Sequence, residues 1–96
     1  MQFVWDDKKS RRNLAKHKIS FETAALAFED PTVFSRLDRV VDGEERWQTM
    51  GLVGGVMVLL VAHTVFEEKG EEGIRIISAR RATRHEREQY EQQQDD

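Results

Sequence analysis

Arginine and several residue types that can carry a proton gather near the carboxyl-terminal end of the chain, in the stretch IISARRATRHEREQY. Four arginines lie within eight residues, from Arg80 to Arg87, although the formal net charge of the chain is −3. The planar guanidinium group of arginine matches two phosphate oxygens, and histidine, glutamate or tyrosine can transfer a proton. These residue types suit metal-independent cleavage of RNA. In that reaction a base deprotonates the 2′-hydroxyl, fixed cations stabilise the phosphorane and an acid reprotonates the 5′-oxygen.

Each residue that fits this chemistry also has a structural interpretation. His63 lies in an apolar run, which is typical of a hydrogen-bonded core histidine, and Tyr90 could cover a sheet. The arginines could form salt bridges on an exposed helix. A module that binds nucleic acid or a protein partner without chemistry therefore remains the alternative function. The residues that fit the chemistry are His17, His63, Arg75, Arg80, Arg81, Arg84, Glu86 and Tyr90.

Metal and cofactor chemistry has little support in the sequence. The three histidines, His17, His63 and His85, stand apart, without an H-x-x-E-H or paired-acid pattern around them. The chain has no cysteine, no phosphate-binding G-x-x-x-x-G-K-[ST] loop and no serine in a nucleophile elbow. We therefore expect neither a metal site nor a cofactor.

Size and composition predict one small cytoplasmic domain. The 96 residues suffice for a single core, and no apolar run approaches the ~20 residues that cross a bilayer. We expect the domain to cover residues 1–90 and residues 91–96 to be a frayed acidic tail. Residues 1–20 hold six Lys or Arg against two Asp, and residues 73–90 hold five Arg against two Glu. Two basic segments could thus converge on a polyanion despite the negative net charge.

The first third of the chain predicts a short strand followed by two helices. Residues 2–5 are of strand-forming type, and Asp6 and Asp7 can cap a helix over residues 8–17. Ser20 then begins a second helix with an apolar stripe, which ends at Asp30 because the residue before Pro31 is pushed out of the helical region.

The remaining two thirds predict four strands and a final helix. Strands are expected over residues 32–41, 46–52, 56–65 and 74–79, with the third buried on both faces and residues 67–73 forming a loop. Asp42-Gly43 is a hairpin signal, and Thr83 with Glu86 forms a capping box that opens the final helix. The fold class is therefore α+β, with a small, mainly antiparallel sheet of four to five strands, N-terminal helices and one C-terminal helix. Arginines around the exposed N–H groups of that final helix would favour an anion.

The sequence resembles the BrnT family of ribonuclease toxins over nearly its whole length. Its first third follows the family pattern F-x-W-D-x-x-K-x-x-x-N-x-x-K-H-x-[IV]-x-F-x-x-A and a later F-x-D-P. The second half continues with Glu45-Arg46, Gly51, His63-Thr64 and the stretch IRIISARRATRHEREQY. In the first third the matching residues are Phe3, Trp5, Asp6, Lys9, Asn13, Lys16, His17, Ile19, Phe21, Ala24, Phe28, Asp30 and Pro31.

This resemblance implies the toxin of a type II toxin–antitoxin pair, a metal-independent endoribonuclease that cleaves RNA to arrest growth. It implies a fold similar to the RelE-like RNases. It also implies a partner, a ribbon-helix-helix antitoxin through which the toxin reaches operator DNA. Position by position, the resemblance implies catalytic roles for His63, Arg75, Arg80, Arg81, Glu86 and Tyr90, and RNA-binding roles for Lys16, His17, Lys69 and Arg84.

One segment departs from the family pattern. The family often carries a turn of the form E-R-G-x-R before the IRIISAR strand, whereas residues 68–73 here read EKGEEG, one residue longer and acidic. Lys69 stands in place of an arginine and lacks its bidentate fork. If this turn holds phosphate, the protein would cleave slowly or prefer a different RNA. A degenerate toxin that acts only within a repressor complex is the corresponding alternative.

Overall fold

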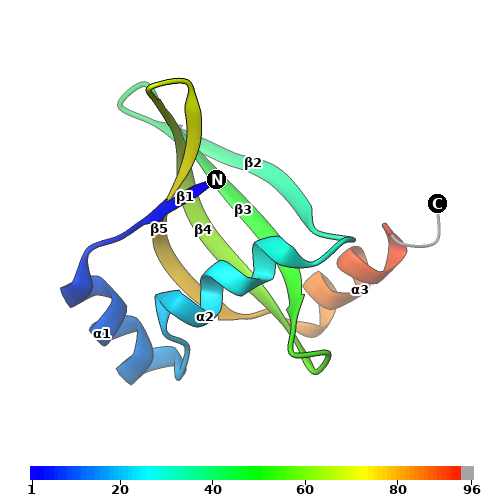
Figure 1. The fold of residues 1–96 in the computed structure, drawn as a ribbon. Helices are drawn as coiled ribbons and strands as arrows, with labels where there is room; N and C mark the ends of the chain where they lie inside the picture. The colour runs from blue at the N-terminus through cyan, green and yellow to red at the C-terminus, as the bar shows by residue number, and fades with distance from the viewer. Residues whose placement is uncertain (94–96) are drawn as a thin grey trace.

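A five-stranded mixed sheet with the order β1-β5-β4-β3-β2 forms the centre of the protein (Figure 1). The computed structural model describes residues 1–93. Three pairings are antiparallel, whereas β1 pairs in parallel with β5. The strands are β1 (Gln2–Val4), β2 (Phe34–Val41), β3 (Glu44–Val53), β4 (Met57–Glu68) and β5 (Glu71–Arg81).

The α+β class and the strand number agree with the sequence-based prediction, but the sheet is mixed rather than simply antiparallel. Strands β2 to β5 follow one another through short turns, and such connections enforce antiparallel neighbours. Two helices separate β1 from β2, so β1 is free to return beside the last strand. Its register, Phe3 opposite Ile74, runs parallel to β5.

The predicted loop over residues 67–73 is wrong. Strand β4 continues to Glu68 and β5 begins at Glu71, so only Lys69 and Gly70 form the turn. Both turn residues have positive φ, 54° and 79°, the backbone twist that suits a two-residue hairpin turn. The last strand also extends past the predicted residue 79 to Arg81. Arg80 and Arg81 therefore lie on a strand rather than in a turn.

The N-terminal helices begin where the sequence predicts and are divided differently. Helix α1 (Asp7–His17) is capped by Asp6, whose carboxylate accepts from the N–H groups of Lys8 and Lys9. Helix α2 (Phe21–Ala25) is capped by Ser20 and continues as a 3₁₀ helix, η1 (Leu26–Glu29), so the second helix is not uniform. Tighter final turns are common at helix ends. Here η1 packs so closely on β3 that a Cβ at Gly51 would overlap the carbonyl oxygen of Ala27.

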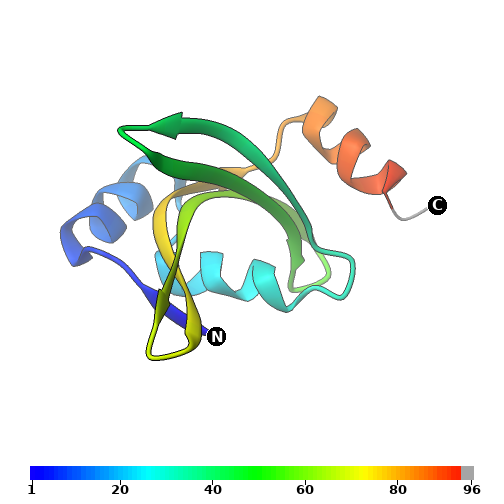
Figure 2. The same cartoon turned by 90° about the horizontal axis from the view of Figure 1, so that it is seen from above.

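The sheet curls around α2 (Figure 2). We call the face toward α2 the inner face and the face away from α2 the outer face. The inner core includes Phe21, Leu59 and Val61. Helix α3 (Arg84–Gln92) covers one end of the outer face, where Leu60 and Tyr90 belong to a second core cluster. Strand β4 is the middle strand and is buried on both faces from Val58 to Val61, as predicted.

Two further expectations concern a frayed tail over residues 91–96 and a chain without a membrane-spanning segment. Residues 91 and 92 of the expected frayed tail belong to α3, and residues 94–96 of it lie outside the described part of the chain. None of the helices within residues 1–93 is long and apolar enough to span a bilayer.

Asn13 ties α1 to the edge of β5 beyond the end of β1. Its side-chain amide donates to the carbonyl oxygens of Ile19 (2.8 Å) and Ala79 (2.7 Å), and its Oδ1 accepts from the N–H of Ala79 (3.1 Å). Asn13 is buried, so water does not replace these bonds. One side chain thus satisfies the carbonyl of Ile19 and the two backbone groups of Ala79 that β1 does not reach.

We predict that Asn13→Ala destabilises the fold strongly. Each buried polar group left without a partner costs about 1–3 kcal/mol, and this variant leaves three of them. Urea unfolding should show a clear fall in the midpoint. Arg12→Ala, an exposed change on the same helix, should move the free energy of unfolding by less than ~0.5 kcal/mol. Equal effects of the two substitutions would contradict the role given to Asn13.

Candidate active site

Arg80 and Glu86 form a bidentate ion pair at the junction between β5 and α3. Nη1 of Arg80 lies 2.7 Å from Oε1 of Glu86, and Nη2 lies 3.0 Å from Oε2. The predicted capping box is confirmed, because Glu86 also accepts from the N–H of Thr83 (2.8 Å) and Thr83 Oγ1 accepts from the N–H of Glu86 (3.2 Å). The hydrogen bonds from Arg80 lower the pKa of Glu86 to about 2, with a further contribution from Thr83 and against the effect of burial. Glu86 is therefore a fixed anion at neutral pH.

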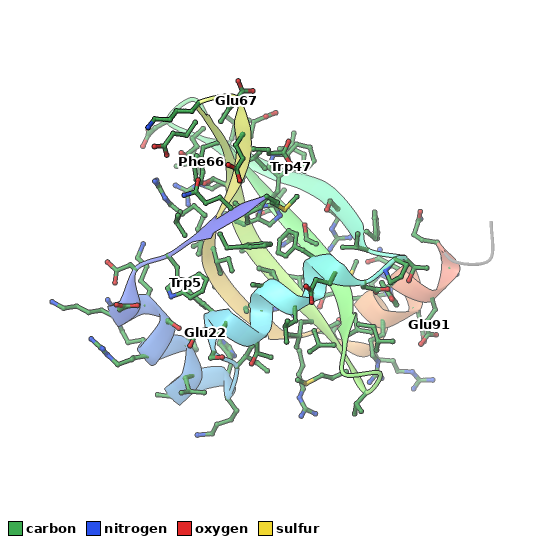
Figure 3. The ribbon with its side chains drawn as sticks, in the orientation of Figure 1. Trp5, Glu22, Trp47, Phe66, Glu67 and Glu91 are labelled. Atoms are coloured by element: carbon green, nitrogen blue, oxygen red, sulfur yellow. The ribbon has the colours of Figure 1, made fainter. Side chains whose placement is uncertain are left out.

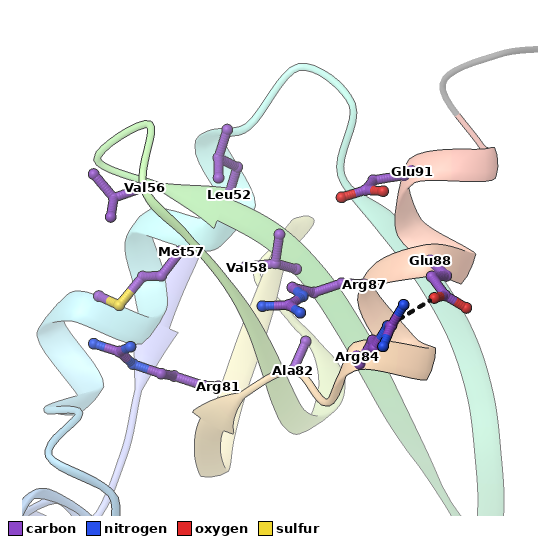
Figure 4. Close-up of a pocket in the computed structure, with 10 residues that line it drawn as sticks. All are labelled: Leu52, Val56, Met57, Val58, Arg81, Ala82, Arg84, Arg87, Glu88 and Glu91. Atoms are coloured by element: carbon purple, nitrogen blue, oxygen red, sulfur yellow. Dashed lines mark hydrogen bonds and ion pairs between the residues drawn. The ribbon is translucent and has the colours of Figure 1, made fainter.

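The other arginines of this segment surround a cavity of about 450 Å³ between α3 and the β3–β4 turn (Figure 4). Arg84 pairs with Glu88 at 3.3 Å, so the salt-bridge interpretation holds for Arg80 and Arg84. No ion pair within residues 1–93 engages Arg81 or Arg87. Two of the four arginines are thus paired with carboxylates of α3, and Arg81 and Arg87 line the cavity without such a pair.

Strand register assembles further arginines on the outer face. Residues directly opposite each other in antiparallel strands project to the same side. Leu60, Ala62 and Thr64 of β4 project to the outer face, and their partners on β5 are Arg80, Ser78 and Arg75. Gln48 faces Ala62 and Arg36 faces Gln48, while Arg39 faces Arg46. We call this set the outer arginine face: Arg36, Arg39, Arg46, Arg75 and Arg80.

A cavity of about 290 Å³ lies in the middle of the outer arginine face. Arg39 and Arg46 line it, together with Ala62 and Ser78. The Nε of Arg46 is buried and has no hydrogen-bond partner among the described residues. Buried donors are rarely left without a partner in folded proteins, so this N–H is an exception among the described residues.

The sequence reasoning missed Arg36, Arg39 and Arg46. Alternation along the 34–53 hairpin, once Asp42-Gly43 fixes its turn, could have placed Arg36 and Arg46 on one face. It could not have placed Arg39 there, because a register shift between Leu37 and Arg39 brings Arg39 opposite Arg46. Arg36 also fixes α3 on the sheet, because Nε donates to Oε1 of Gln48 (3.0 Å) and Nη1 donates to Oε1 of Gln89 (3.1 Å). Arg36 therefore helps to place the helix that carries Glu86.

His63 lies on the inner face of the sheet, whereas Arg80 lies on the outer face. Its side chain is buried beside the ring of Phe28, at a centroid distance of 5.1 Å. Nε2 lies 2.6 Å from Oγ1 of Thr49 and Nδ1 lies 3.3 Å from the carbonyl oxygen of Thr64. Burial lowers the pKa of His63, although the hydrogen bond to Thr64 acts in the other direction. These are the features of the hydrogen-bonded core histidine that the sequence left open.

Tyr90 anchors α3 to the segment before β2. Its hydroxyl donates to Oδ2 of Asp30 and lies 2.9 Å from Oγ1 of Thr32. Asp30 also accepts from the N–H of Leu52 at 2.8 Å. Burial alone would raise the pKa of Asp30, but the hydrogen bonds from Leu52, Tyr90 and Thr32 together lower it. The phenol is buried in the second core cluster rather than presented to solvent.

The remaining sequence-predicted residues lie away from the Arg80–Glu86 pair. Arg75 shares the outer face and stacks on Phe66, with its guanidinium carbon 5.9 Å from the ring centroid. Lys69 sits in the β4–β5 turn, at the end of the sheet away from α3 (Figure 1). Lys16 and His17 end α1, which lies across the molecule from α3 in both views (Figures 1 and 2). The fold therefore gathers Arg80, Arg81, Arg84 and Glu86, and separates the rest.

The described residues contain no group of three or more His, Cys, Asp or Glu side chains placed to hold a metal ion. What the site offers instead is an array of guanidinium groups on a rigid sheet, with one bidentate carboxylate that holds Arg80 in place.

Comparisons with known proteins place this architecture among ribonuclease toxins. The model of the family described as "Ribonuclease toxin, BrnT, of type II toxin-antitoxin system" matches residues 5–86. The 1.1 Å crystal structure of the Brucella abortus ribonuclease toxin BrnT is similar, with a TM-score of 0.61 and 26% sequence identity. The similarity covers 88% of this chain and 99% of that one. Comparison with curated proteins finds no match.

We predict that the stabilising effect of Glu86 depends on pH. Because its folded-state pKa lies below the ordinary carboxyl value of 4.5, its contribution is complete above about pH 4.5 and is lost as pH falls towards about 2. The destabilisation caused by Glu86→Gln, measured by urea unfolding, should therefore be largest near neutral pH and shrink over that window.

Glu88→Gln is the matched control for this measurement. Its ion pair with Arg84 is exposed, and exposed pairs contribute little to stability. A Glu86→Gln effect that stays constant from pH 7 to pH 3 would show that the carboxylate charge is not what stabilises the junction.

Proposed function

This chain belongs to the BrnT family of ribonuclease toxins of type II toxin–antitoxin systems, as its sequence motifs indicated, and we propose that it cleaves RNA without a metal ion and thereby arrests growth. The observation that carries the proposal is the family match over residues 5–86. That span includes the first-third motif from Trp5 onward, the strands of the outer arginine face and the Arg80–Glu86 pair. Chemistry and family thus point to the same substrate.

The RNA backbone would lie along the outer arginine face. Guanidinium groups from β2, β3 and β5 project from one side of the sheet, so successive phosphates could contact different strands. The cavity lined by Arg39 and Arg46 supports a phosphate near the middle of this face. Arg84, at the first turn of α3, would add positive charge where exposed N–H groups already favour an anion.

Arg80 is the residue that we assign to the phosphorane. Of its five N–H donors, two bond Glu86 and one bonds the carbonyl oxygen of Arg81, which leaves two for phosphate oxygens. Glu86 acts as a positioning residue, because its fixed charge holds the guanidinium fork in one orientation before substrate arrives. Fixed donors that need no reorganisation are the most effective way to stabilise developing charge.

The other sequence-predicted residues receive supporting roles in this proposal. Arg75 and Arg81 would contact neighbouring phosphates. Burial and hydrogen bonding of His63 and Tyr90 favour structural roles over proton transfer. Lys16, His17 and Lys69 would meet only RNA that extends beyond the cleaved nucleotides.

The proposal extends to partners and place of action. The family implies an antitoxin, and we infer a ribbon-helix-helix protein that carries the toxin to operator DNA and represses the operon. We also infer action in the cytoplasm, where RNA is available, and a relation to RelE-like RNases, supported by the α+β topology. The domain would comprise residues 1–90.

A non-catalytic module is the second candidate function, and one observation favours it. Arg80 and Arg84 are neutralised within the protein, and the low pKa of Glu86 makes it a weak base. Such a module would bind RNA with an affinity that falls steeply with salt and leave it intact.

We predict that the antitoxin-free protein cleaves single-stranded RNA in EDTA and that Arg80→Ala lowers the rate by at least about 10²-fold, the typical cost of removing a donor to developing charge. Arg80→Lys should restore little, because an ammonium group lacks the bidentate fork. Arg11→Ala, an exposed change on α1, should leave the rate unchanged. Intact RNA with the folded wild-type protein would exclude the nuclease and favour the module.

We further predict that expression of the wild type arrests growth and fragments total RNA, whereas the Arg80→Ala/Glu86→Ala double variant does neither. Circular dichroism of the purified variant should confirm its fold, since the pair also stabilises the β5–α3 junction. Arrest with intact RNA would mean that toxicity does not come from RNA cleavage.

A further inference from the structure

An apolar cavity on the inner face is left uncovered by the helices. It measures about 420 Å³, and its lining includes Phe28, Val33, Trp47 and Val65, with His63. Phe28 is in η1, and its ring contacts His63. This contact marks how far the 3₁₀ helix covers the inner face of the sheet. Trp47 lies beyond it, near the end of the sheet that carries the β2–β3 and β4–β5 turns (Figure 3). The inner core therefore continues into a cavity that no helix covers.

Exposed aliphatic side chains surround this cavity. Leu37 lies opposite Trp47 on the edge strand β2 and is 47% exposed, and Val65 is 43% exposed. Strand β2 is the last in the sheet order, so no described strand covers its outer edge. Apolar patches of this kind, rimmed by charge, mark interaction sites in soluble proteins.

The negative charge around this cavity favours a positively charged partner. Glu45 and Glu72 line the cavity itself. The two adjoining hairpin ends add Asp42, Glu44, Glu67, Glu68 and Glu71, against Arg46 and Lys69. Arg46 is already paired with Glu44 at 3.4 Å. The carboxylates around this inner-face cavity repel phosphate, whereas the arginines of the outer arginine face and of the α3 cavity attract it.

We propose that this inner-face cavity is a docking site for the antitoxin, occupied by a segment that carries an aromatic or aliphatic side chain flanked by lysine or arginine. The inference rests on the proposed function for the existence of the antitoxin, and on the apolar cavity with its acidic rim for the surface and the chemistry. The buried anchor would supply most of the affinity, and the basic residues would pair with Glu45 and Glu72. RNA and antitoxin thus meet the protein on surfaces of opposite charge.

The test is calorimetric titration of purified cognate antitoxin into charge-reversal variants of the full chain. Glu45→Lys/Glu72→Lys should weaken binding by at least about tenfold, because it places like charges opposite the basic segment. Glu22→Lys/Glu91→Lys is the matched control, with the same change in net charge on α2 and α3, away from the cavity (Figure 3). It should bind within about twofold of the wild type, since exposed charges beyond a Debye length are largely screened.

A second variant tests the apolar half of the site. Val65→Ser removes an exposed aliphatic contact without disturbing the core and should also weaken antitoxin binding. RNA cleavage by antitoxin-free Glu45→Lys/Glu72→Lys and Val65→Ser is measured alongside and should equal that of the wild type.

Several results would overturn the docking site. Full affinity of Glu45→Lys/Glu72→Lys, equal weakening in both double variants, or no binding of antitoxin to the wild type would each do so. Weakening by Arg81→Glu/Arg87→Glu alone would place the antitoxin in the α3 cavity. Loss of RNA cleavage rather than of antitoxin binding in Glu45→Lys/Glu72→Lys would assign the cavity to the substrate. Cleavage of RNA without docking leaves the proposed function intact, whereas loss of both in the wild type refutes it as well.

Discussion

The hydrogen bonds between Asn13 and the backbone of Ala79 hold in place the end of β5 that carries Arg80. Strand β1 covers only the first part of the β5 edge, and the side chain of Asn13 continues the pairing where β1 stops. Ala79 directly precedes Arg80, so the same contact fixes where β5 presents its arginine to the opposite face. Helix α1 contributes to the site by fixing this strand, without lying near the Arg80–Glu86 pair.

Residues that identify the family are largely those that build the frame. Asp6 caps α1, Asn13 satisfies β5, and Asp30 accepts from the backbone of β3 and from Tyr90 on α3. Trp5 packs edge-on against Phe21 at a centroid distance of 6.3 Å. Such residues are hard to replace because they cap a helix, as Asp6 does, satisfy buried backbone groups, as Asn13 does, or fill fixed space. The family motif therefore indicates the fold more directly than it indicates the catalytic residues.

Charge is distributed over this small protein by strand alternation. One face of the sheet carries arginines from three strands, while the hairpin ends beyond the inner face carry carboxylates. A net charge of −3 averages over these opposing regions and conceals both. The acidic residues 68–73, which depart from the family pattern, lie at the end of the sheet away from the Arg80–Glu86 pair. Their charge lies at the inner-face cavity, through Glu72, more than at the outer arginine face.

The sequence by itself determined the order of the elements, where the helices begin and the first hairpin turn, but not the ends of β4 and β5. Asp6, Ser20 and Thr83 begin the helices, Asp42-Gly43 turns a hairpin, and the unbroken apolar run before His63 is the middle strand, because caps, turns and periodicity are local effects. Only the tertiary structure decided that β1 pairs in parallel with β5 and that His63 and Arg80 lie on opposite faces. It also decided that Arg36, Arg39 and Arg46 join Arg75 and Arg80 on the outer face. Those relations depend on which strands meet and in what register, and residues far apart in the chain settle that by burying a shared core.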